Sequence, residues 1–181
     1  PFRRGDKTFY FFSDGKKQQA VFMMEDCIKC DPEVILDPNE FSEDGTVSLS
    51  DISVSPNGEY LAFSLSDGGS DWKTWKVLDI KERKETDDLI RWSKFSYATW
   101  ESDSSGFYYQ KYQQPDEVLS DINRSPQLFF HRLGDKQDED KLIYEDKENP
   151  DFSWSINVPE KGSYRILSIG EGTDERNFLY I

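Results

Sequence analysis

Apolar and polar residues alternate along short segments of this chain, most clearly between residues 51 and 66. On an extended segment, Leu61, Phe63 and Leu65 fall on one face, and the residues between them fall on the other. Both faces carry apolar side chains, which is typical of a strand whose sheet packs between two neighbouring sheets. The pattern therefore predicts β-strands that are buried on both sides.

Similar short apolar segments recur along the chain and are bounded by turn residues. They predict further strands at residues 7–13, 21–24, 34–36, 72–78, 98–100, 107–112, 128–133 and 142–144. The charged residues 81–88 show no apolar stripe of helical spacing, so we interpret them as a solvated hairpin loop rather than a helix. Residues 113–126 are predicted to form a longer loop.

A turn-and-strand motif repeats at intervals of about 50 residues. The string S-P-N-G-E-Y-L-A-F at residues 55–63 recurs in weaker form at 102–109 and 159–167. The glycines of the three copies are Gly58, Gly106 and Gly162, so the intervals are 48 residues (58 to 106) and 56 residues (106 to 162). This is the length of one four-stranded propeller blade, and each glycine is expected to supply a positive φ in a tight turn.

The repeat predicts an all-β fold, a β-propeller fragment of about three and a half four-stranded antiparallel blades. We expect blades at about residues 1–49, 50–92 and 93–149, with a truncated fourth at 150–181, because a closed ring needs at least about four blades. Only 35% of the residues are apolar, yet 15% are aromatic, so large rings are expected to fill the space between sheets.

Composition argues against several classes of partner. The formal net charge of −14 repels nucleic acid and anionic lipid, both of which require clustered Lys and Arg. A run of about 18 apolar residues, which a membrane helix needs, does not occur in the sequence. We therefore expect no nucleic-acid or membrane partner, and a cytoplasmic location.

The two cysteines, Cys27 and Cys30, form a single C-x-x-C string. A zinc site would need two more ligands, and His131 is the only histidine of the chain. We expect no metal and no cofactor, and we interpret the cysteines as reduced, partly buried thiols, with a disulfide as the alternative.

Five separated strings, in order, resemble the propeller of the prolyl oligopeptidase family. They are D-P-N-x-x-S-x-D-G-T-V at 37–47, L-S-x-G-G-S-D-W at 65–72, K-F-S-x-x-x-W at 94–100, G-F-Y-Y at 106–109 and L-F-F-H-R-L-G at 128–134. The resemblance implies the first half of a seven-bladed propeller that accompanies a catalytic α/β-hydrolase domain. That domain is expected to be absent from residues 1–181.

The resemblance further implies the activity of the parent protein. Members of this family are serine peptidases that cleave short peptides after proline, and their propeller admits short peptides while refusing folded proteins. The nearest match to a G-x-S-x-G nucleophile turn runs from Gly68 to Trp72, where tryptophan replaces the last glycine. We expect a structural role for His131 and no catalytic residue in this chain, which alone should be inactive.

Motif by motif, the resemblance also implies substrate-binding residues. Phe95 matches a phenylalanine that lines the pocket for the residue two before the scissile proline, with a core phenylalanine as the alternative. Asp71 and Trp72 match a string at the domain interface, although Asp71 could instead cap a strand. Gly170 stands where the family has a carbonyl-binding arginine, and Thr173 stands where it has a cysteine.

A second function class remains open from the sequence. A stand-alone propeller that binds a protein or peptide, without a hydrolase domain, would carry the same blade repeats. A G-x-S-x-G turn in an accompanying hydrolase domain would separate the two interpretations.

Overall fold

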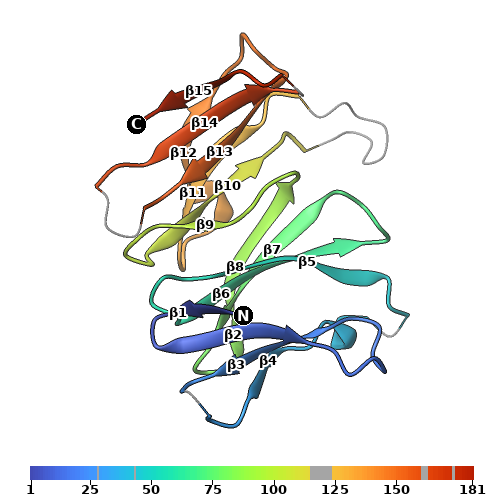
Figure 1. Ribbon diagram of the computed structural model, residues 1–181. Helices are drawn as coiled ribbons and strands as arrows, with labels where there is room; N and C mark the ends of the chain where they lie inside the picture. The colour runs from blue at the N-terminus through green and yellow to red at the C-terminus, as the bar shows by residue number, and fades with distance from the viewer. Residues whose placement is uncertain (28, 43, 115–123, 160–162, 173) are drawn as a thin grey trace.

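Four antiparallel sheets follow one another along the chain in the computed structural model, which describes residues 1–27, 29–42, 44–114, 124–159, 163–172 and 174–181 (Figure 1). In every sheet, strands that are consecutive in sequence are neighbours in space. This meander of short antiparallel strands confirms the all-β blade architecture expected from the repeat.

The first two sheets have four strands each. The first contains β1 (Phe2–Arg4), β2 (Lys7–Phe12), β3 (Val21–Glu25) and β4 (Glu33–Leu36), followed by the short helix η1 (Pro38–Glu40). The second contains β5 (Val47–Val54), β6 (Tyr60–Asp67), β7 (Lys73–Asp79) and β8 (Lys84–Ser93).

The third sheet again has four strands and the fourth has three. The third contains β9 (Thr99–Trp100), β10 (Gly106–Lys111), β11 (Gln127–Arg132) and β12 (Lys141–Glu145), with the short helix η2 (Gln137–Glu139) before β12. The fourth contains β13 (Phe152–Asn157), β14 (Ile166–Glu171) and β15 (Asn177–Tyr180).

Each pair of neighbouring sheets encloses its own apolar core. Between the first and second sheets, the buried Phe9 and Phe22 pack with Leu61 and Phe63. On the opposite face of the second sheet, Ala62 packs with the third sheet. Strand β6 is thus buried on both faces, as the alternation of its side chains predicted.

The core between the second and third sheets and the core between the third and fourth sheets are rich in aromatic rings. Trp75 of the second sheet packs with Phe107 and Tyr109 of the third. Tyr108, which points to the other face of β10, packs with Trp154 of the fourth sheet. Large rings therefore fill the space between the sheets, which explains how a chain of modest apolar content forms a packed interior.

The first strands of the four sheets converge on a common centre. A cleft of about 260 Å³ is lined by residues of β1, β5 and β9 and by the end of β13, among them Arg4, Ser53, Thr99 and Asn157. Sheets that share a centre through their first strands are arranged radially, as in a propeller.

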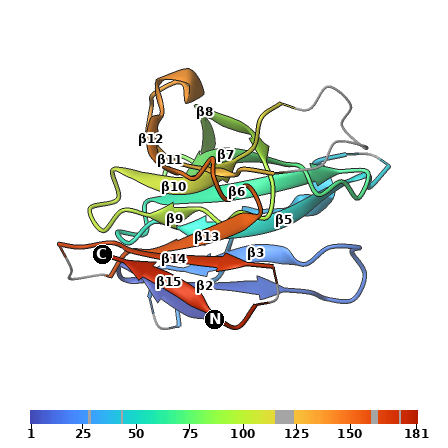
Figure 2. The ribbon, with the colours of Figure 1, turned by 90° about the horizontal axis from the view of Figure 1, so that it is seen from above.

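Strand direction divides the connections between two ends of the molecule. One end, called here the loop end, carries the connections β2–β3, β6–β7, β8–β9 and β14–β15. The other, called the turn end, carries the connections β1–β2, β5–β6 and β9–β10. Figure 1 shows the β6–β7 connection at the right and the β5–β6 and β9–β10 turns at the left, and Figure 2 shows the same separation from above.

Glycines at the turn end serve two different purposes. Gly58 has φ +72°, and a Cβ on it would lie 2.7 Å from the carbonyl oxygen of Arg4 in the β1–β2 turn. Gly5 makes the reciprocal approach, 2.6 Å from the carbonyl oxygen of Asn57. The expectation of a positive φ is wrong for Gly106, which begins β10; there a Cβ would lie 2.1 Å from the carbonyl oxygen of His131. Gly162 lies outside the described residues.

The strand predictions need correction in the second sheet and in the first. Residues 81–88 are not a solvated loop throughout, because β8 begins at Lys84 and Asp88 is buried. Side chains of β8 do alternate between inward and outward positions, but Asp88 places a carboxylate at an inward position, so the residues showed no alternation of apolar and polar types. Strand β1 was not predicted, since its three residues are exposed and include Arg3 and Arg4.

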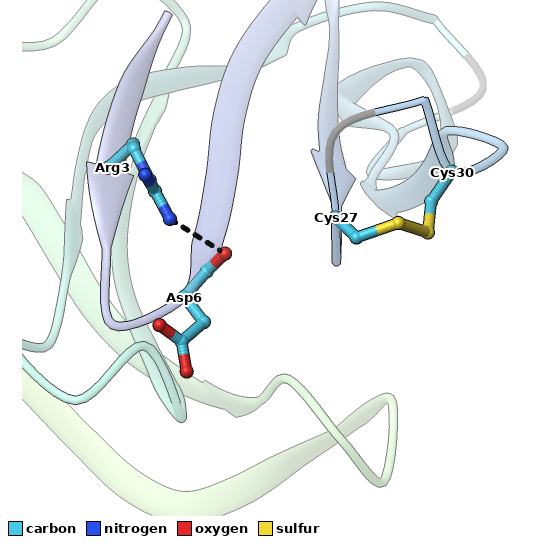
Figure 3. The surroundings of a disulfide bond; sticks show 4 residues. All are labelled: Arg3, Asp6, Cys27 and Cys30. Atoms are coloured by element: carbon cyan, nitrogen blue, oxygen red, sulfur yellow. Dashed lines mark hydrogen bonds between the residues drawn. A yellow bond between two sulfur atoms is a disulfide. The ribbon is translucent and has the colours of Figure 1, made fainter.

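The prediction of reduced thiols is also wrong. Cys27 and Cys30 form a disulfide in the connection between β3 and β4 (Figure 3). The backbone N–H of Cys30 also donates to the carbonyl oxygen of Cys27, at 3.1 Å, so a turn brings the two cysteines together. Figure 3 also draws Arg3 and Asp6 of the β1–β2 hairpin, where the Arg3 guanidinium donates to the carbonyl oxygen of Asp6 at 3.4 Å.

The described residues contain no helix with the length and apolar character that a membrane-spanning helix requires.

Candidate functional site

A lysine at the loop end brings together three of the residues singled out from the sequence. The ammonium of Lys94, just after β8, lies 5.2 Å from the ring centre of Trp72 and 5.2 Å from that of Phe95. It also lies 3.5 Å from a carboxylate oxygen of Asp71. We call Asp71, Trp72, Lys94 and Phe95 the Lys94 cluster, in which one cation interacts with two aromatic faces and one carboxylate.

The backbone next to the Lys94 cluster is in an uncommon conformation. Trp92 has φ +61° and Phe95 has φ +50°, values that cost of order 1 to 3 kcal/mol for residues with a side chain. Such positions persist only where surrounding contacts determine them. The geometry therefore reflects contacts that hold this segment in place.

Contacts with the third sheet supply that support. The backbone N–H of Tyr112, after β10, donates to the carbonyl oxygen of Trp92 at 2.9 Å. The Trp72 ring meets the rings of Trp92 and Tyr112 edge to face, with centroids 5.8 and 6.3 Å apart. Edge-to-face pairs are favourable arrangements of aromatic rings. The Lys94 cluster is thus anchored at the seam between the second and third sheets.

Exposure determines what the Lys94 cluster can bind. Phe95 is 61% exposed, so it lies on the surface rather than in the core. The side chain of Asp71 is 64% exposed, and the capping contact is made instead by Ser70, whose hydroxyl accepts from the backbone N–H of Trp72 at 3.1 Å. The loop end therefore presents an apolar ring and a carboxylate to solvent, which suits an apolar side chain and a cationic group.

Gly170 lies on a different sheet from the Lys94 cluster. It belongs to β14, where it is paired with Ser153 of β13 and Asn177 of β15, one residue before that strand ends at the loop end. A Cβ built on Gly170 would meet no atom within 4 Å. The two groups share one end of the molecule without forming one cluster. Thr173 lies outside the described residues.

Ser70 and His131 do not form a catalytic pair. Ser70 belongs to the β6–β7 connection. The fully buried ring of His131 has its Nδ1 2.7 Å from an oxygen of Asp140 and its Nε2 2.8 Å from an oxygen of Asp88. Both ring nitrogens are thus occupied by carboxylates. Among the residues that the structure describes, no group of three His, Cys, Asp or Glu side chains is placed to hold a metal ion.

Three residues that shape this site were not singled out from the sequence. Lys94 stood inside the quoted K-F-S string, where a lysine next to a phenylalanine could have suggested a cation–π contact, but its approach to Asp71 and Trp72 depends on how two connections meet. Trp92 and Tyr112 gave no comparable signal, because their contacts depend on the packing of two sheets.

Comparison with known proteins now identifies the family. The model of the prolyl oligopeptidase N-terminal beta-propeller domain matches residues 1–181. The chain belongs to this family. The expectation drawn from the five motif strings is therefore confirmed, and it extends over the whole chain.

Relatives with curated names agree with this assignment. A prolyl endopeptidase of Elizabethkingia miricola is 37% identical over 183 aligned residues, which cover 100% of this chain and 26% of the relative. Prolyl oligopeptidase A of Galerina marginata is 32% identical and is covered over 28% of its length. The chain thus spans about a quarter of the length of these relatives.

Solved structures match the fold closely. A prolyl endopeptidase from a study of inter-domain dynamics has a TM-score of 0.86 and 28% identity, covering 98% of this chain and 25% of its own. Prolyl oligopeptidase B of Galerina marginata, bound to a 35-residue hydrolysis and macrocyclization substrate, has a TM-score of 0.87 and 27% identity, covering 96% and 27%. The four sheets are therefore blades of a prolyl oligopeptidase propeller.

Proposed function

We propose that this chain is the gating and substrate-filter portion of a serine-type prolyl oligopeptidase that cleaves short peptides after proline. The match of residues 1–181 to the propeller family carries the proposal. Relatives that contain this propeller are named prolyl endopeptidase or prolyl oligopeptidase, and a solved relative is bound to a peptide substrate. The alternative of a stand-alone binding scaffold gains no support from these relatives.

The catalytic groups would come from an α/β-hydrolase domain of the same parent chain. The serine of the nearest nucleophile-like string, Ser70, makes a local turn contact, and the ring nitrogens of His131 are both occupied. A Ser–His–Asp triad requires the nucleophile and its base to be within hydrogen-bond reach of each other. Residues 1–181 alone should therefore be inactive.

The loop end is the surface that we propose to face the hydrolase domain and the substrate. Phe95 would contact the side chain two residues before the scissile proline, because its exposed ring offers apolar surface without polar requirements. Asp71, together with Trp72, would accept a cation from substrate or from the hydrolase domain. Gly170 leaves open space where the family's arginine would donate to a substrate carbonyl. Thr173, which lies outside the described residues, is the last substrate-binding residue that we propose.

Substrate selection would follow from size. A folded domain is far wider than the centre of a small propeller, whereas an extended peptide can pass through the propeller or between the domains. The net charge of −14 argues against nucleic acid and membrane partners, which we do not propose.

The disulfide bears on the cytoplasmic location predicted from the sequence. Disulfides form and persist mainly in oxidising compartments and are rare in the cytosol. The Cys27–Cys30 bond therefore argues against that prediction and favours an oxidising compartment. Thiol labelling of the protein in freshly lysed source cells, before and after reduction, would decide between the two.

Cleavage of a defined peptide tests the proposed activity. The protein carrying this chain is incubated with a short peptide that contains one internal proline, and with a matched peptide that has alanine in its place. Mass spectrometry should find cleavage after the proline only, and a fluorophosphonate that reacts with catalytic serines should abolish it. Cleavage of both peptides, or insensitivity to the fluorophosphonate, would overturn the proposal.

A further inference from the structure

His131 joins two sheets through a fully buried contact that the proposed function does not use. The imidazole, on β11 of the third sheet, is hydrogen-bonded to Asp88 of β8 in the second sheet. Its other nitrogen is bonded to Asp140, which follows η2 in the third sheet. We call Asp88, His131 and Asp140 the His131 bridge; it crosses the same seam that anchors the Lys94 cluster.

Only a protonated imidazole, which carries a proton on each ring nitrogen, can donate a hydrogen bond to both carboxylates. An ionised carboxylate accepts hydrogen bonds and cannot donate, so both ring nitrogens must carry a proton to make both bonds. Asp88 also accepts from the backbone N–H of Gly134 at 2.7 Å and from the hydroxyl of Thr86. Asp140 also accepts from the hydroxyl of Tyr109 at 2.6 Å. A neutral imidazole would therefore leave one carboxylate facing a ring lone pair.

The titration of the bridge follows from these contacts. Burial by itself lowers the pKa of His131, but hydrogen bonds to Asp140 and Asp88 outweigh it and raise the pKa to about 9. Burial would raise the pKa of Asp88, yet its hydrogen bonds with His131, Thr86 and Gly134 lower it below its ordinary value. Burial and the contact with Asp140 raise the pKa of Tyr109, so this phenol keeps its proton while the histidine titrates.

We propose that the His131 bridge is a protonation-dependent contact that holds the second sheet to the third. With one positive and two negative groups it stabilises the seam, and after the loss of the proton two buried carboxylates remain against a neutral ring. The titratable groups described around the imidazole are Asp88 on β8, Asp140 beside η2 and, through Asp140, Tyr109 on β10. The seam should therefore open more readily as the pH rises.

The pH range follows from the sign of the shift. A histidine whose pKa is raised on folding contributes fully below its unfolded pKa of about 6.5 and loses this contribution as the pH rises through its folded pKa. The window thus extends from about pH 6.5 to about pH 9. Because Trp92 and Tyr112 cross the same seam beside Trp72, weakening there would reach the Lys94 cluster.

A neighbouring contact that does not titrate provides the matched control. Gln137 of η2 accepts from the backbone N–H of Arg91 at 3.0 Å and donates to the carbonyl oxygen of Arg91 at 2.9 Å. It therefore also joins the third sheet to β8, through backbone atoms of Arg91. Its amide also donates to the Tyr109 hydroxyl at 3.4 Å, but this phenol keeps its proton throughout the window. Gln137→Ala should weaken the seam equally at every pH, whereas His131→Gln should weaken it at pH 6.5 and have a much smaller effect at pH 10.

The decisive test is NMR on the unmodified protein. The histidine signal is assigned by its nuclear Overhauser contacts with the ring of Phe107, whose centroid lies 5.3 Å away, and it should titrate near pH 9. Hydrogen exchange, corrected for its intrinsic pH dependence, should show loss of protection at the Tyr112 amide by on the order of 100-fold between pH 7 and pH 10. The amide of Ile80, which bonds within the second sheet, serves as the internal reference.

Because the NMR measurements use the unmodified protein, they decide the proposal even if His131→Gln fails to fold. Titration of the signal below pH 7 would overturn it. A signal near pH 9 with unchanged protection at Tyr112 relative to Ile80 would also overturn it, because the bridge would then not hold the seam. Loss of protection at Tyr112 between about pH 6.5 and pH 9, levelling off above the pKa of His131, would support it.

Discussion

Gly170 lies on β14 with open space beside its Cα, and we propose that it stands where the family has a substrate-binding arginine. Residues 168–173 resemble the family string S-I-R-E-G-C, in which Ser168, Ile169, Glu171 and Gly172 match. Because a charge-assisted hydrogen bond is worth roughly 1.5 to 3 kcal/mol, its absence should weaken the hold on a substrate carbonyl.

Restoring the side chain tests this role of the position. Gly170→Arg should lower KM for a short proline peptide by about tenfold, since a guanidinium can donate to the substrate carbonyl. The control Gly170→Ala adds a Cβ into open space and should leave KM unchanged. Steady-state kinetics of both variants measure the effect, and equal KM values for the two would refute the assigned role.

Individual residues also show what the sequence could not reveal. The motif strings located Asp71, Trp72 and Phe95, but not the ammonium of Lys94 between them, which depends on how two connections meet. His131 was expected to be structural, and its position between two carboxylates depends on Asp88, a residue 43 positions away. Such long-range polar contacts leave no local pattern in a sequence.

At the scale of elements, the turns at the turn end hold neighbouring sheets together. The backbone N–H of Gly5 donates to the carbonyl oxygen of Pro56 at 3.1 Å, and the N–H of Asn57 donates to the Ser104 hydroxyl at 3.2 Å. The β1–β2 turn thus contacts the β5–β6 turn, which in turn contacts the β9–β10 turn. In the first copy of the repeated string, Gly58 belongs to this contact as well as to the turn itself.

Two glycines of nearly equal φ allow the cost of backbone strain to be measured separately from the cost of losing the contact between turns. Gly58 (φ +72°) approaches the Arg4 carbonyl, whereas a Cβ on Gly15 (φ +73°) would meet nothing within 4 Å. Gly15→Ala should cost about 1 to 2 kcal/mol from backbone strain alone. Gly58→Ala should cost about 1 to 2 kcal/mol more, because the turns must also separate. Urea unfolding midpoints measure both, and equal losses would contradict a role for the contact between the turns.

Most elements were predictable, and the failures have physical causes. Alternation located most strands of the first three sheets, where apolar side chains are buried between neighbouring sheets. It failed at β8, where Asp88 points inward to His131, and at β1, whose three residues are exposed. The individual strands of the fourth sheet, β13, β14 and β15, were not predicted. The disulfide could not be decided from spacing, because a C-x-x-C string fits thiols, metal ligands and a bridge alike.

At the scale of the whole molecule, four sheets share a centre and present two different ends. Three separate cores lie between the sheets, so neighbouring blades are held by packing and by polar contacts such as the His131 bridge. The proposed substrate residues that the structure describes, Asp71, Trp72, Phe95 and Gly170, lie at the loop end. The repeat predicted this architecture because its interval is the length of one blade, and the motif strings predicted it because they resemble those of a propeller family.

Selection by size predicts that the same cleavage site is cut in a free peptide and protected in a folded domain. The same proline-containing sequence is presented to the protein as a free short peptide and within a stably folded domain, with the unfolded form of that domain as a control for the added residues. We expect rapid cleavage after proline in the free peptide and none in the folded domain. Equal rates of cleavage for the free peptide and the folded domain would contradict selection by size.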